Sequence, residues 1–121
     1  MSRTILLVED FEDSRLVIKL ILEGYGYLVD VAVNGFEAIA SFKHHFPDLI
    51  LMDIAMPGMD GLTATKAIRK LKGGATIPII AVTAFGKQCY EKAIEAGCNE
   101  LIGKPVDFDS IETVIHHYLE E

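Results

Sequence analysis

Five short runs of apolar, often β-branched residues recur along the chain, and they constrain its fold more than any other feature. The runs cover residues 4–8, 27–33, 49–52, 77–82 and 101–102. In some of them the hydrophobicity is continuous rather than alternating, as in ILLV at residues 5–8 and LILM at residues 49–52. Continuous hydrophobicity is typical of strands that are covered on both faces, as in parallel sheets. We therefore expect five parallel strands with helices on both sides of the sheet.

Longer segments between these runs carry apolar residues at helical spacing. They cover residues 13–24, 36–46, 61–72, 86–97 and 107–119. Glycines that commonly follow helix C-termini, such as Gly24, Gly73 and Gly97, lie at several of their ends. This alternation predicts an α/β, flavodoxin-like, doubly wound (βα)₅ fold, whose five-stranded parallel sheet has the order 2-1-3-4-5.

The chain has 121 residues, half of them hydrophobic, which suits one domain with one well-buried core. We therefore expect a single domain over residues 1–121. Eighteen acidic and 11 basic residues give a net charge of −7, which argues against direct nucleic-acid binding. The first apolar run is too short for a signal peptide, and no run approaches membrane-spanning length. We expect a soluble cytoplasmic protein.

Polar residues follow four of the expected strands at their carboxyl ends. Glu9 and Asp10 follow the first strand, Asp53 the third, Thr83 the fourth and Lys104 the fifth. Because these ends lie at one edge of a parallel sheet, we expect the side chains to converge beside the point where strand order reverses. Each alone is more simply a helix N-cap or a solvated charge, but coincidence is the weaker account of all five.

Three carboxylates held close together repel one another by about 4 kcal/mol per pair, at 4 Å and an effective dielectric near 20. Shifted pKa values would offset this repulsion, but a hard dication with oxygen ligands offsets it directly. Glu9, Asp10 and Asp53 therefore predict a magnesium site. A carboxylate beside such an ion can attack a phosphoryl group, and Asp53 is the candidate nucleophile. Lys104 and Thr83 would stabilise charge on the phosphoryl oxygens.

Over essentially its whole length, the sequence resembles the receiver domains of two-component response regulators, especially single-domain regulators of the chemotaxis type. The motifs that carry the resemblance are ILLVEDFEDSR, VAVNGFEAI, PDLILMDIAMPGMDG, PIIAVTA and AGCNELIGKP. The resemblance implies that Asp53 is phosphorylated and that Glu9 and Asp10 bind Mg²⁺ together with Asp53 and the backbone carbonyl of Ala55. It implies that a histidine kinase or histidine phosphotransfer protein donates the phosphate.

The resemblance also implies a switch. Phosphorylation would change a partner-binding face made by the fourth helix, the fifth strand and the fifth helix, through which the domain contacts a downstream protein. The Lys104–Pro105 peptide bond would be cis, which would turn the lysine into the crevice. Leu101 stands where the family commonly has an aromatic ring that rotates inward, so we expect a smaller or differently built rearrangement.

Two further positions bear on how long the phosphate would stay attached. In receiver domains the residues two after the Asp and two after the Thr border the path of the hydrolytic water, and here they are Ala55 and Phe85. Neither side chain is polar enough to orient or activate water. A long-lived phosphorylated state is therefore our hypothesis.

Two other functions fit parts of the pattern. A metal-dependent aspartyl-phosphate hydrolase or phosphatase would use the same nucleophile, but residues 53–55 lack the second Asp that haloacid-dehalogenase-type phosphatases use. A flavin-binding electron carrier shares the fold, but the acids within residues 9–13 would repel a cofactor phosphate. We therefore expect no enzyme activity beyond self-catalysed phosphotransfer and autodephosphorylation.

The first helical segment is unusually apolar. Leu16, Val17 and Leu20 lie among further apolar residues, so the helix has apolar side chains around most of its circumference. A wide core-facing stripe is the simpler explanation. By resemblance, this helix helps to dock the phosphodonor, and the extra apolar residues would then form part of a partner groove.

Overall fold

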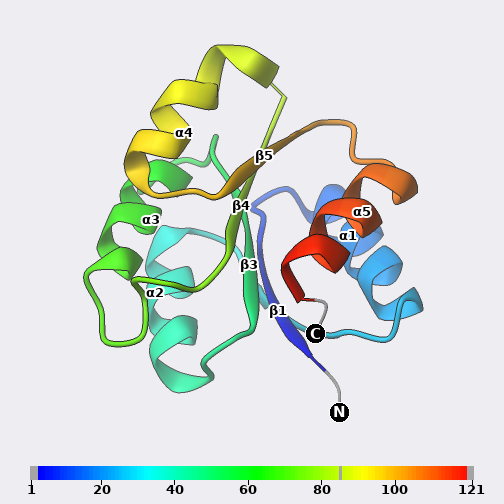
Figure 1. Cartoon of the computed structure of the whole chain (residues 1–121), viewed down its shortest axis with the longest axis horizontal. Helices are drawn as coiled ribbons and strands as arrows, with labels where there is room; N and C mark the ends of the chain where they lie inside the picture. The colour runs from blue at the N-terminus through cyan, green and yellow to red at the C-terminus, as the bar shows by residue number, and fades with distance from the viewer. Residues whose placement is uncertain (1–2, 85, 120–121) are drawn as a thin grey trace.

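Five parallel strands form the central sheet of the structure, a computed structural model that describes residues 3–84 and 86–119 (Figure 1). The strands are β1 Thr4–Val8, β2 Leu28–Ala32, β3 Leu49–Asp53, β4 Ile79–Thr83 and β5 Glu100–Gly103. Their order is β2-β1-β3-β4-β5, which confirms the predicted order. All four strand pairs are parallel, so the carboxyl ends lie at one edge.

Helices cover both faces of this sheet (Figure 1). They are α1 Glu12–Gly24, α2 Gly35–His44, α3 Gly61–Arg69, α4 Tyr90–Ala96 and α5 Phe108–Leu119, with the 3₁₀ segment η1 Gly86–Cys89 before α4. Helices α1 and α5 pack on one face, and α2, α3 and α4 pack on the other. None of the described helices is both long enough and apolar enough to pass through a bilayer.

The continuous hydrophobicity of the strands follows from this layering. Every residue of β3 is buried, and successive side chains point to opposite faces. Ile50 and Met52 pack with α2, α3 and α4, whereas Leu49 and Leu51 pack with α1 and α5. A central strand therefore needs apolar residues at every position, because it supplies two cores at once.

The face of α1 that packs into the core is narrower than its sequence suggests. Its buried side chains are Ile18, Ile21 and Leu22. Leu16, Val17 and Leu20 are 57%, 54% and 59% exposed, so the wide-core interpretation is wrong for these three residues. The outward face of α1 is therefore apolar.

Local signals fix the turn that follows β3. The Asp60 side chain accepts a hydrogen bond of 2.8 Å from the Thr63 amide and so caps the N-terminus of α3. At Gly61 the chain returns so close to β3 that a Cβ atom would collide with the carbonyl oxygen of Asp53. Glycine is required at this position because only a residue without a side chain permits that approach.

Candidate functional site

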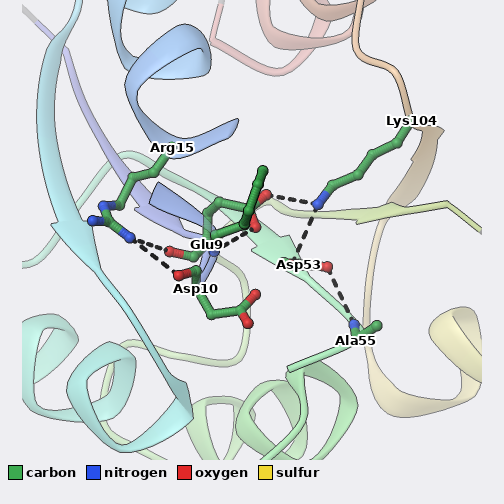
Figure 2. Close-up of polar contacts among 7 residues, drawn as sticks. Glu9, Asp10, Arg15, Asp53, Ala55 and Lys104 are labelled. Atoms are coloured by element: carbon green, nitrogen blue, oxygen red, sulfur yellow. Dashed lines mark hydrogen bonds and ion pairs between the residues drawn. The ribbon is translucent and has the colours of Figure 1, made fainter. Parts of the chain in front are cut away.

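Three carboxylates meet at the carboxyl edge of the sheet, where β1 and β3 lie side by side (Figure 2). Glu9 and Asp10 follow β1, and Asp53 ends β3. One carboxylate oxygen from each residue lies within 4.8 Å of the other two. Glu9 and Asp53 are only 1% and 3% exposed, while Asp10 is partly exposed. The structure thus brings together the three side chains that the sequence predicts as metal ligands.

Lys104 reaches this cluster from the end of β5 (Figure 2). Its Nζ lies 2.8 Å from Glu9 Oε1 and donates a 3.4 Å hydrogen bond to Asp53 Oδ2. The Lys104–Pro105 bond is cis, as the resemblance implies. Burial by itself lowers the pKa of Lys104, but the hydrogen bonds and negative charges of Glu9 and Asp53 outweigh it and raise the pKa overall. The ammonium is therefore held in its charged form.

The carboxyl group of Asp53 is in electrostatic conflict with its surroundings. Its pKa is raised to about 7, first by burial and then by the hydrogen bond and negative charge of Glu9. Lys104 and the backbone amide of Ala55, which lies 3.2 Å from Asp53 Oδ1, lower the pKa but do not cancel the rise. One lysine is thus too little positive charge for the carboxylates around it.

This donor set fits a hard divalent cation. The candidate ligands are all carboxylate oxygens, they are close enough to share one ion, and two of the three residues are shielded from solvent. Mg²⁺ prefers such oxygen ligands and needs only a few of them, with water or phosphate completing its shell. The predicted contribution of the Ala55 carbonyl stays a prediction, since the contact observed for Ala55 comes from its amide.

The remaining predicted positions are placed only in part. Thr83 ends β4 and is fully buried, and its carbonyl oxygen accepts a 2.8 Å hydrogen bond from the Lys104 amide. Its hydroxyl contact with a phosphoryl group stays a prediction. Leu101 lies in β5 and packs, partly buried, against the core beneath α2, α3 and α4. Phe85 lies outside the described residues, so its proposed shielding of the phosphate is a hypothesis.

Arg15 is a further residue of the site, and the sequence pattern alone predicts no role for it. Its Nη1 donates to the carbonyl oxygens of Glu9 and Asp10, at 3.1 and 3.4 Å (Figure 2). The Phe11 amide donates to Glu9 Oε2 at 3.2 Å. These contacts hold the turn between β1 and α1 and leave the Asp10 carboxylate directed toward the cluster. Only its position in the sequence points to this role, because Arg15 lies in the first turns of a helix that starts just after Glu9 and Asp10.

Comparison with known proteins agrees with this geometry. A family model described as the response regulator receiver domain matches residues 5–116. The chain belongs to the response regulator receiver domain family. As a receiver domain, it is a component of two-component signalling.

The receiver domain has relatives of nearly equal length. It is 40% identical over 121 residues to the chemotaxis protein CheY of Bacillus subtilis, with 98% of the chain and 99% of CheY covered. It is 36% identical over 120 residues to the polar-differentiation response regulator DivK of Brucella abortus, with 98% of each covered.

Solved structures give the same result. The receiver domain of the sensor histidine kinase PA1611 from Pseudomonas aeruginosa matches with a TM-score of 0.92 and 33% identity over the full length of both chains. That structure has a magnesium ion coordinated in its active-site cleft. The chemotaxis protein CheY4 of Vibrio cholerae matches with a TM-score of 0.93 and 25% identity, covering 98% of this chain and 100% of CheY4.

Proposed function

We propose that this receiver domain is a magnesium-dependent phosphorelay switch in which Asp53 accepts a phosphoryl group from a histidine kinase or histidine phosphotransfer protein. The main support is the buried cluster in which the Lys104 ammonium lies 2.8 Å from Glu9 and 3.4 Å from Asp53. Glu9 and Asp53, together with Asp10, form a cluster of three carboxylates that suits a divalent cation. Nucleophile, cation and metal ligands are thus in one place.

In the proposed reaction, a carboxylate oxygen of Asp53 forms a bond to phosphorus as the phosphorus–nitrogen bond of the donor phosphohistidine breaks. The electron pair of that bond leaves with the imidazole. Lys104 and Thr83 would contact the phosphoryl oxygens, where charge is greatest in the transition state. A magnesium ion held by Glu9, Asp10, Asp53 and the Ala55 carbonyl would neutralise part of this charge.

The output of the switch would lie at the neighbouring strands. Phosphorylation replaces the single negative charge of the Asp53 carboxylate with a phosphoryl group that carries nearly two. This group would lie beside Thr83, which ends β4, and Lys104, which follows β5. These strands pair with each other and lead into α4 and α5, so a shift at either end is passed to the face formed by α4, β5 and α5. With Leu101 in place of an aromatic residue, we expect a modest rearrangement between two states that differ by a few kcal/mol.

We further propose that residues 1–121 act as one cytoplasmic binding module, without direct nucleic-acid contact. The net charge of −7 supports the last point. Its chemistry would be limited to its own phosphorylation and dephosphorylation. The exposed, apolar Ala55 offers no polar group to the hydrolytic water, which supports a long-lived phosphorylated state.

The decisive experiment is incubation with acetyl phosphate and Mg²⁺, followed by intact-mass analysis. We expect one added phosphoryl group in the wild-type protein and in Asp30→Asn, a control on the edge strand β2. The Asp53→Asn variant should gain none, and a chelator should suppress the reaction. A phosphorylated Asp53→Asn variant would contradict the assignment, as would steady turnover of small phosphomonoesters.

A further inference from the structure

A hollow lies at the edge of the sheet opposite the carboxylate cluster, before the starts of β3 and β4. Its volume is about 540 Å³. It is lined by Phe42, Lys43, Phe46, Leu71, Lys72 and Gly73. The carboxylate cluster lies at the carboxyl ends of β1 and β3 in the same parallel sheet, so the two sites are separated by the length of the sheet. This volume lies within the range of known ligand pockets, about 300–1,000 Å³.

Two phenylalanines give the hollow an aromatic surface. Phe42 is buried in the core at 2% exposure, and the ring of Phe46 lies 4.9 Å from it, centroid to centroid. Phe46 itself is 58% exposed. Gly73 has a φ of +82°, and a Cβ atom there would collide with the Phe46 ring. The Phe46 ring is therefore held between Phe42 and the loop at Gly73, and it is still open to solvent.

Two lysines add positive charge to this aromatic surface. Lys43 lies in the last turn of α2, and Lys72 follows α3; both are exposed. Within residues 3–84 and 86–119, neither ammonium forms an ion pair. A lysine in a last helical turn complements the helix dipole, which accounts for Lys43 but not for Lys72, three residues beyond the end of α3. The hollow is thus locally basic on a protein of net charge −7.

We propose that this hollow docks an acidic segment of a partner protein that carries one aromatic side chain, and that docking is independent of phosphorylation at Asp53. The aromatic side chain would pack against Phe46 and Leu71, because offset or edge contacts between rings are favourable. Carboxylates on either side of it would pair with Lys43 and Lys72. The distance from the carboxylate cluster leaves both sites usable at once.

A second copy of the chain is the competing occupant. Residues 9–13 read EDFED, and Phe11 is 59% exposed. However, Glu9 is buried and paired with Lys104, and Asp10 belongs to the same cluster, so only the acids on one side of Phe11 are available. A partner segment with free acids on both sides of its aromatic residue fits two lysines better.

The test uses the full ¹⁵N-labelled chain and the peptide acetyl-Glu-Asp-Phe-Glu-Asp-amide. We expect amide shifts at residues 43–46 and 71–73, both in the untreated wild-type protein and after its phosphorylation by acetyl phosphate and Mg²⁺. The double variant Lys43→Gln/Lys72→Gln should weaken binding about fivefold, which corresponds to about 1 kcal/mol for the loss of two exposed ion pairs. A matched variant, Lys66→Gln/Lys92→Gln, removes two exposed lysines elsewhere and should bind as the wild type does.

Several results would overturn the proposal. These are equal binding of a peptide with alanine in place of phenylalanine, equal binding of acetyl-Lys-Lys-Phe-Lys-Lys-amide, or no effect of the double variant at the hollow. Loss of binding after treatment of the wild-type protein with acetyl phosphate and Mg²⁺, with binding retained in Asp53→Asn under the same treatment, would contradict independence from phosphorylation. Concentration-dependent sedimentation that Phe11→Ala abolishes would assign the hollow to a second copy instead. Phe46→Leu, which keeps an apolar side chain against Phe42, should weaken binding while circular dichroism stays unchanged.

Discussion

The carboxyl group of Asp53 makes the stability of the metal-free fold depend on pH. Its pKa is 3.8 in an ordinary setting and about 7 in the folded protein, so the folded state binds this proton more tightly than the unfolded chain does. The free energy of unfolding should therefore fall as the pH rises from about 4 to about 7. A full shift of this size corresponds to about 4 kcal/mol at most, at 1.36 kcal/mol per pKa unit.

Urea unfolding in the presence of a chelator checks this expectation. The Asp53→Asn variant cannot ionise at this position, so it should be more stable than the wild type at about pH 8, with the difference shrinking toward pH 4. Asp30→Asn should keep the wild-type pH response. Parallel pH profiles for the wild type and Asp53→Asn would show that burial of this charge does not limit stability.

Arg15 should affect metal binding without touching the metal. Replacing it with lysine keeps the charge but loses the planar guanidinium that donates to the carbonyl oxygens of both Glu9 and Asp10. We expect Arg15→Lys to weaken Mg²⁺ binding about tenfold, in the range typical of residues that orient metal ligands. Calorimetric titration measures this, with Lys19→Arg on the same helix as the control. Equal affinities would limit Arg15 to a structural role.

Residues at strand ends could be predicted, and residues that act through side-chain reach could not. Glu9, Asp53 and Lys104 converge because the topology alone brings their backbone positions to one edge. The contacts of Arg15 depend on how its side chain folds back over the preceding turn, and hydrophobic periodicity carries no such information.

At the scale of elements, substitutions on the outward face of α1 should distinguish loss of phosphodonor docking from loss of stability. Val17 also lines a hollow of about 480 Å³ together with Lys104 and Pro105, so the apolar face of α1 extends to the carboxylate cluster. If a phosphodonor docks there, Leu16→Glu should slow phosphotransfer from a kinase or phosphotransfer protein. Phosphorylation by acetyl phosphate, which needs no docking, should be unchanged.

Thermal unfolding provides the control for that experiment. Leu16 is 57% exposed, so its substitution should leave the melting temperature nearly unchanged. Ile18→Ala, in the core of the same helix, should lower stability by about 2–5 kcal/mol. A strongly destabilised Leu16→Glu variant would mean that the residue supports the fold rather than docking.

Helix ends were the least predictable elements. Apolar spacing over residues 86–97 predicts one helix, but the segment consists of η1 and a seven-residue α4. Helix α4 begins after Cys89, which provides no side-chain cap. The third helix ends at Arg69 rather than at residue 72. The Arg69 guanidinium donates to the carbonyl oxygens of Gly74, Ile77 and Gly97, which ties the chain back against the sheet. The helical spacing of apolar residues continues past Arg69, so this spacing does not show where α3 ends.

At the scale of the molecule, one sheet separates two cores that should unfold together. Ile50 and Leu51 are neighbours in β3, both fully buried, and they point into opposite cores. Ile50→Ala and Leu51→Ala should each lower the free energy of unfolding by about 2–5 kcal/mol. Because both strand faces belong to one sheet, each variant should still show one transition, the same by tyrosine fluorescence and by circular dichroism.

Leu20→Ala, on the exposed face of α1, is the matched control and should change stability by less than about 0.5 kcal/mol. Two separate transitions in either core variant would show that the layers are independent. The arrangement of layers was also the most predictable feature, because only strands buried on both faces need uninterrupted apolar sequences such as that of residues 49–52.

The groups around Asp53 come from strands on both sides of α3 in the sequence: β1 and β3 precede it, and β4 and β5 follow it. The turn after α3 lies at the edge of the sheet opposite these groups. A backbone cut in that turn would leave the three acids on one fragment and Thr83 and Lys104 on the other. Neither half would hold a complete cluster, so uptake of phosphate would report that the halves had reassembled. If each fragment were fused to a different protein, phosphorylation of Asp53 would show that the two proteins had bound each other.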